Sequence, residues 1–229
     1  MTNLTTTANA TQPLGCSANP TAEKIAKTFA YCVMVVVSLT GNILIATIVF
    51  KIKSMRRTIN YLIVNMAMAD LIVPIFVFPR ILTKLYIGSW LVDGTFGLAL
   101  CKLAYFMQDI SATVSIQSLV LIAAERFGAV VYPFRPPLVS AKLCPFYILG
   151  TRILAVAILL PFLFVRKLKE SQGHLSCQLE WSETFEDASS IENYFLELLF
   201  VLVVIPFALM TTLYSIIITS SGIAVYFAG

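Results

Sequence analysis

Five segments of the sequence are each apolar over a length that can cross a lipid bilayer as a helix. A bilayer core of about 30 Å needs roughly 20 apolar residues, because every backbone polar group must be bonded within the segment. The sequence predicts helices over about 28–50, 60–86, 98–131, 144–165 and 194–218. The first has no charged residue, and neither has the 198–218 part of the fifth. A soluble helical core would need helices with charged outer faces, which these segments lack.

The composition agrees with a membrane protein. Hydrophobic residues make up 59% of the 229 residues and charged residues 12%, whereas a soluble domain carries about 25% charged residues. The net charge of +4 is not gathered in a basic tail or an aromatic-interleaved patch, so nucleic-acid binding is not expected. The single histidine, His174, has no nucleophile or metal-binding cluster around it, and the sequence therefore does not predict an enzyme.

The charges of the connecting loops predict an orientation. The first loop is basic and has no acid, which is typical of the cytoplasmic side, whereas the loop after the fourth span is rich in Glu and is expected outside. Residues 1–27 then form an extracellular tail, 28–218 the transmembrane domain and 219–229 a short C-terminal tail of a multi-pass plasma-membrane protein. The sequons at Asn3 and Asn9 are predicted glycosylation sites.

Short motifs stand in a fixed order on the predicted spans. They are Gly41-Asn42, Asn65 with Ala69-Asp70, Cys101, Glu125-Arg126-Phe127, and Pro206 with Tyr214. Together they resemble the rhodopsin-like (class A) G-protein-coupled receptors, and the resemblance covers about residues 28–218. It implies an all-α membrane protein, five transmembrane helices of a seven-helix receptor bundle. It also implies that an extracellular signal is passed to heterotrimeric G proteins.

Gln108 and Ser111 lie on one polar face of the third span, and Asp109 is beside Gln108 but rotated by about 100° around the helix; these three residues are the predicted ligand pocket. A polar stripe should face the protein interior, although Ser111 could simply allow close helix packing. Receptors for biogenic amines resemble one another in an Asp at the position of Gln108, so its replacement favours a neuropeptide-like receptor with a peptide ligand. Asp109 could pair with a basic ligand group or with a neighbouring helix. The acidic loop suits a basic peptide or is simply solvated.

Two cysteines are expected to form a disulfide. Cys101 lies at the outer end of the third span and Cys177 in the long extracellular loop, and the secretory route is oxidising. The family resemblance implies the same bridge, which would hold the loop over the bundle. Two free thiols are the alternative.

The resemblance also implies two functional sites along the bundle. Asp70, Ser115 and Asn42 would hold a sodium ion or a water cluster, although a protonated, hydrogen-bonded Asp70 is the alternative. Glu125, Arg126 and Phe127, with Tyr214 on the fifth span, would form the ionic lock that opens when a G protein binds. Ordinary interfacial placement of the Arg126 side chain is the alternative there.

Two features depart from the family pattern. Arg152 stands where the fourth helix usually has Trp, nine residues before Pro161, and it should either face an interior acid or be poorly tolerated. After Tyr214 there is no basic loop and no CWxP or NPxxY motif, so the sequence predicts a receptor lacking helices six and seven. Two alternatives remain: a non-signalling form that associates with full-length receptors, and a small membrane transporter, although internal repeats are not evident.

Overall fold

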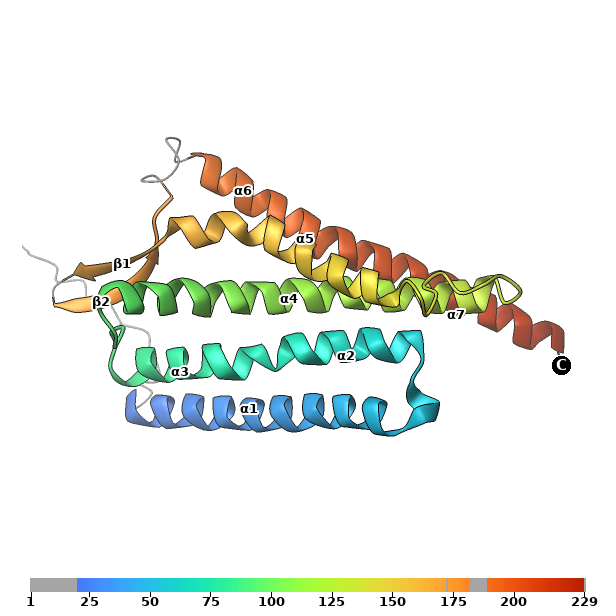
Figure 1. Ribbon diagram of the computed structural model, residues 1–229, viewed down its shortest axis with the longest axis horizontal. Helices are drawn as coiled ribbons and strands as arrows, with labels where there is room; N and C mark the ends of the chain where they lie inside the picture. The colour runs from blue at the N-terminus through green and yellow to red at the C-terminus, as the bar shows by residue number, and fades with distance from the viewer. Residues whose placement is uncertain (1–19, 172, 182–188, 229) are drawn as a thin grey trace, which may run out of the picture.

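The computed structural model describes residues 20–171, 173–181 and 189–228, and its long helices lie side by side, with α2 and α3 between α1 and α4 (Figure 1). The helices are α1 Pro20–Lys51, α2 Thr58–Asp70, α3 Ile72–Tyr86, α4 Gly94–Val131, α5 Cys144–Val165, α6 Ser189–Leu199 and α7 Ile205–Ala228. A 3-10 turn, η1, covers Lys53–Met55, and a π-helical turn, η2, covers Phe200–Val204. Two strands, β1 Arg166–Ser171 and β2 His174–Leu179, follow α5.

The helices combine into five candidate membrane spans, as the sequence predicts. These are Pro20–Lys51, Thr58–Tyr86, Gly94–Val131, Cys144–Val165 and Ile191–Ser220. Large apolar side chains on their outer faces, such as Phe29 and Ile75, are exposed. An outer surface of this kind is stable in lipid but not in water, because apolar surface is driven out of contact with water.

Two helices extend beyond the spans expected from the sequence. Residues 20–27, assigned to the N-terminal tail, are the first turns of α1, and residues 219–228, assigned to the C-terminal tail, continue α7. The start of α1 was missed because its charged residues look like part of an aqueous tail. Pro20 is well suited to a first helical turn, and Glu23 and Lys27 form an exposed ion pair one turn apart.

Proline explains the two places where a predicted span is not one continuous helix. The second span breaks at Leu71, between α2 and α3, because Pro74 lacks an N–H for the carbonyl of Asp70 and crowds it. The fifth span has the π turn η2, which ends at Val204 shortly before Pro206; this proline cannot donate to the carbonyl of Leu202. Transmembrane helices tolerate such breaks, because nearby groups satisfy the freed backbone atoms.

A β-hairpin is the one departure from an all-helical fold within the described residues, and the sequence did not predict it. β1 and β2 pair antiparallel from Arg166 opposite Leu179 to Ser171 opposite His174. Gly173 in the connection has a φ of +76°, which only glycine adopts without strain. Figure 1 shows the hairpin at one end of α4, here called the hairpin end; the opposite end is called the Arg126 end.

The larger buried cluster joins the middle of α4 to α5 and reaches the hairpin end. Phe106, Ile110 and Val114 of α4 pack with Leu159 and Phe162 of α5, and Trp181 closes the cluster after β2. Tyr194 of α6 packs against it and donates a hydrogen bond to the carbonyl of Ile158. A smaller cluster of Leu62, Val139 and Cys144 lies towards the Arg126 end.

Candidate functional site

The hairpin is held to α4 by a disulfide between Cys101 and Cys177, as expected. Cys101 is fully buried, and the backbone N–H of Trp90 donates to the carbonyl of Leu175 at 2.6 Å, which ties the α3–α4 loop to β2. Gly97 is required beneath the hairpin because a Cβ there would lie 2.0 Å from the carbonyl oxygen of Val92. These contacts hold the hairpin in place as a cover over one end of the helix bundle.

Under this cover, two arginines contact one aromatic ring. The guanidinium carbon of Arg80, on α3, lies 3.9 Å from the centre of the Tyr105 ring, and that of Arg166, on β1, lies 3.6 Å from it. Arg80 also donates from Nη2 to Oε1 of Gln108 at 2.5 Å. Burial lowers the pKa of the Arg166 guanidinium from its ordinary value, while the nearby Asp109 carboxylate opposes that change. Arginine nevertheless stays charged in proteins.

Two of the three predicted pocket residues lie at this cluster. Asp109 and Arg166 line a cavity of about 530 Å³ between α4, α5 and the fifth span, whose other walls are mainly apolar, including Phe162 and Phe195. Gln108 lies beside it through its bond to Arg80. Ser111 is buried in the bundle and does not line this cavity, which agrees with the packing alternative.

Near the middle of the bundle, two of the three predicted sodium-site residues meet. Ser115 Oγ donates to Oδ1 of Asp70 at 2.7 Å. Asn42 does not join them by a hydrogen bond: its amide nitrogen donates to the carbonyl of Ser38 within α1 at 2.8 Å. Within the described residues no group of three or more His, Cys, Asp or Glu side chains could hold a metal ion.

Arg152 has a neutral partner, whereas the sequence suggested either an interior acid or a poorly tolerated segment. Its Nε donates to Oδ1 of Asn65 at 3.2 Å, and the buried amide nitrogen of Asn65 donates to Ser118 at 3.0 Å and to Thr151 at 3.3 Å. This network joins α2, α4 and α5. The charge is tolerated because a polar interior group accepts from it and its side chain is only half-buried.

At the Arg126 end, the predicted lock residues point to different partners. Glu125 is buried and accepts a hydrogen bond from the backbone N–H of Val139 in the α4–α5 loop at 2.9 Å. Arg126 is exposed and lines a cleft of about 490 Å³ together with Arg57. No ion pair joins Glu125 to Arg126 in the part of the chain that the structure describes.

The other two predicted residues of this end are separated. Phe127 packs edge-on against Tyr132, with ring centres 6.0 Å apart. Tyr214 lies on α7 and is exposed, and among the described residues it makes no hydrogen bond to Arg126. The predicted glycosylation sites Asn3 and Asn9 lie outside the described residues.

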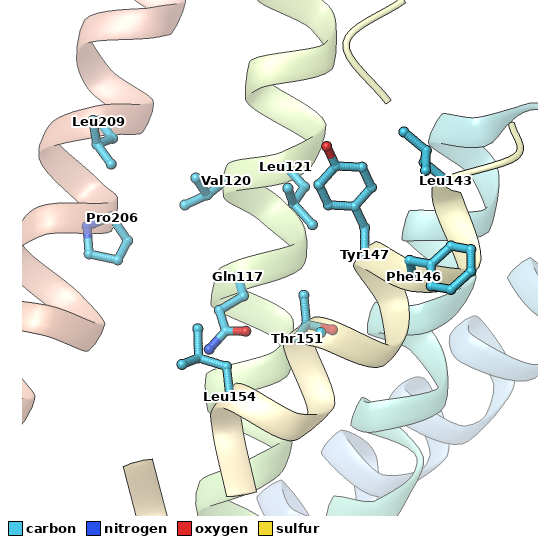
Figure 2. A pocket seen from close by; sticks show the side chains of 11 residues that line it. Gln117, Val120, Leu121, Leu143, Phe146, Tyr147, Thr151, Leu154, Pro206 and Leu209 are labelled. Carbon is cyan, nitrogen blue, oxygen red and sulfur yellow. The ribbon is translucent and has the colours of Figure 1, made fainter. Parts of the chain in front are cut away.

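A further cavity, of about 570 Å³, lies between α4, α5 and α7 and is mainly apolar (Figure 2). Leu121, Phe146 and Leu209 contribute to its walls. Gln117 contributes an amide to its walls and Tyr147 and Thr151 contribute hydroxyl groups, and the buried Oε1 of Gln117 has no hydrogen-bond partner within the described residues.

Sequence reasoning missed the contacts of Arg80, Tyr105 and Arg166. A signal was present in part: Arg80 directly follows Pro79 inside an apolar span, and Tyr105 precedes Gln108 by three residues, which places both near one face of α4. The third member could not be found, because Arg166 reaches the cluster only through the hairpin, which the sequence did not predict.

Comparison with known proteins establishes the family. The model of the rhodopsin family of 7-transmembrane receptors matches residues 41–221, which is most of the chain. The chain therefore belongs to the rhodopsin family of seven-transmembrane receptors, a family of receptors and not of enzymes. Its multi-pass membrane fold and the resemblance noted from its motifs are thereby confirmed.

Similar relatives are peptide receptors. The chain is 32% identical over 204 residues to the QRFP-like peptide receptor of Branchiostoma floridae, covering 86% of this chain and 51% of that protein. It is 33% identical over 188 residues to the Substance-K receptor of Canis lupus familiaris, covering 82% and 47%. It is 34% identical over 143 residues to Neuropeptide FF receptor 2 of Mus musculus, covering 62% and 33%. The chain spans about half the length of the first two.

Proposed function

We propose that this chain belongs to a peptide receptor that signals to a heterotrimeric G protein, with both a ligand-facing end and a G-protein-facing end in the described helices. The observation that carries the proposal is the disulfide-held hairpin over a polar cluster at one end of α4, with Arg126 exposed in a cleft at the other. The names of the relatives support a peptide ligand. Ligand binding would shift a two-state bundle, because it favours the state it contacts best.

The proposed orientation places the hairpin end and residues 1–19 outside the cell and the Arg126 end in the cytoplasm. The basic first loop, with Lys53, Arg56 and Arg57, supports it. Digestion of the expressed protein with a glycosidase should shift its mobility, and an Asn3→Gln, Asn9→Gln double variant should not shift. An undigested wild-type band together with a protease-protected N-terminus would reverse the orientation.

A sodium ion at Asp70 is part of the proposal. Asp70 and Ser115 bring two oxygen atoms to one place, and oxygen ligands suit a hard cation. Asn42, whose amide nitrogen is bonded within α1, would have to offer its oxygen. Sodium chloride should then raise the melting temperature relative to choline chloride, and Asp70→Asn should remove the difference. Equal melting in both salts would favour the protonated, hydrogen-bonded carboxyl.

The signalling test uses the chain expressed alone in cells with a G-protein dissociation reporter. Peptides named for the relatives, the QRFP, substance K and neuropeptide FF types, are applied, and activation should be lost in Arg126→Gln. A chain that stays silent to all of them while co-purifying with a co-expressed full-length relative would instead support a receptor-associating, oligomer-forming role.

A further inference from the structure

Beneath the hairpin, positively charged side chains outnumber negatively charged ones. Two guanidinium groups lie within 3.9 Å of the centre of the Tyr105 ring, which requires them to occupy its two faces. The cation–π contacts hold both arginines, but the two like charges repel one another across the ring. Asp109 is the carboxylate that faces Arg166, and the partner of Arg80 is the neutral amide of Gln108. The cluster therefore has one positive charge more than it has negative charge.

The same cluster has donors without acceptors. The Nε atoms of Arg80 and Arg166 and the indole nitrogen of Trp90 are buried and have no hydrogen-bond partner within the described residues. Arg80 and Trp90 line one cavity of about 90 Å³ under β2, together with Lys84. A buried donor left unpaired costs about 1–3 kcal/mol, so two such donors beside one cavity, with that of Arg166 across the Tyr105 ring, indicate that an acceptor belongs at this cluster.

We propose that Arg80, Lys84, Trp90, Tyr105 and Arg166, here called the arginine site, bind a carboxylate of the ligand. A carboxylate accepts several hydrogen bonds and supplies the missing negative charge, and arginine recognises it well. The adjoining cavity of about 530 Å³, lined by Phe162, Phe195 and Leu202, would take an apolar group next to that carboxylate. The inference rests on the proposed receptor function and names the chemistry of its ligand.

Either the chain end or an acidic side chain of a peptide could supply the carboxylate. Three small probes separate these sources on the purified chain in lipid nanodiscs: N-acetylphenylalanine, N-acetylaspartic acid with its α-carboxyl methylamidated, and N-acetylphenylalanine amide. Unfolding is followed by a thiol-reactive dye at Cys144, which is buried, in a Cys16→Ser, Cys32→Ser background. A probe that binds the folded state raises the melting temperature with its concentration.

The carboxylate probes should stabilise the protein and the amide should not. N-acetylphenylalanine acting alone assigns the site to a chain end, and the aspartate probe acting alone assigns it to a side chain. Arg80→Gln and Arg166→Gln should each weaken carboxylate binding about tenfold or more. Asp109→Asn should strengthen it, because it removes the competing carboxylate.

Arg135→Gln is the matched control. Arg135 also stacks on a tyrosine, with its guanidinium 4.9 Å from the Tyr132 ring centre, but at the Arg126 end. It should leave probe binding unchanged. The melting temperature without probe shows whether each variant folds, and Arg80→Lys, which keeps the charge, should retain part of the binding.

Equal stabilisation by the carboxylate and amide probes, or carboxylate binding unaffected by both glutamine variants, would overturn the inference and leave water as the acceptor. Peptide-driven G-protein activation that survives Arg80→Gln and Arg166→Gln together would also count against it. Carboxylate binding at the arginine site in a chain that activates no G protein would instead count against the receptor proposal alone.

Discussion

The two ends of α4 hold their neighbours in different ways. At the hairpin end a covalent bond, Cys101–Cys177, fixes β2 to the helix, and beneath it Arg80 and Arg166 have Nε donors without a hydrogen-bond partner among the described residues. At the Arg126 end the α4–α5 loop is held by a hydrogen bond from Val139 to Glu125, and Arg126 remains exposed. One end is closed over a cluster of charged groups, and the other is open at a cleft that Arg57 and Arg126 line.

This difference indicates how each end of α4 would respond to a binding partner. A ligand that fills the hairpin end would satisfy donors and charge that are already ordered, so little further ordering is required. A partner at the Arg126 end would meet a side chain that is not committed to Glu125. The ionic lock that the family resemblance implies is thus absent between those two residues in this arrangement, within the described part of the chain.

Removing the Cys101–Cys177 disulfide should have the largest effect on stability. Cys177→Ser opens a bridge that joins residues 76 positions apart, and removal of such a bridge costs about 2–4 kcal/mol. The melting temperature should fall and the hairpin backbone should exchange hydrogen faster, while exchange at Val139 stays unchanged. Faster exchange at both ends would show that the two ends are not independent.

The second-largest loss of stability is expected at the centre of the bundle, between the two ends of α4. Asn65→Ala leaves the half-buried charge of Arg152 without its acceptor, with an expected loss of about 2–3 kcal/mol. Arg152→Leu should cost less, and in the double variant the loss should be smaller than the sum of the two. Additive losses would mean that the Asn65–Arg152 hydrogen bond does not contribute to stability.

The spans could be predicted because length and lack of charge alone decide whether a segment crosses a bilayer. The Cys101–Cys177 bridge and the Asp70–Ser115 contact also matched what the family motifs imply. The partner of Arg152 could not be predicted, since it depends on the rotation of α2 against α5. The arginine site depends on two further steps, the break at Leu71 that resets the phase of α3 and the hairpin that delivers Arg166.

The loop contact at the Arg126 end should have a smaller effect than the bridge. Glu125→Ala removes the acceptor for the buried N–H of Val139, which should lower stability by about 1–2 kcal/mol and speed hydrogen exchange in the α4–α5 loop. Glu125→Gln keeps an acceptor oxygen and serves as the control, with most of the stability retained. A loss as large in Gln as in Ala would show that the negative charge, and not the hydrogen bond, holds this end.

The smallest change in stability should come from Arg126 itself. Its exposed side chain has no ion pair with Glu125 to lose, so Arg126→Gln should change the free energy of unfolding by less than about 0.5 kcal/mol. The same change at Arg80 removes a cation–π contact and a hydrogen bond but also relieves repulsion with Arg166. Matched thermal melts of the two variants compare the ends directly. A large loss of stability in Arg126→Gln would mean that the Arg126 side chain pairs with a group in the bundle. The Arg126 end of α4 would then not be open, in contrast to the description above.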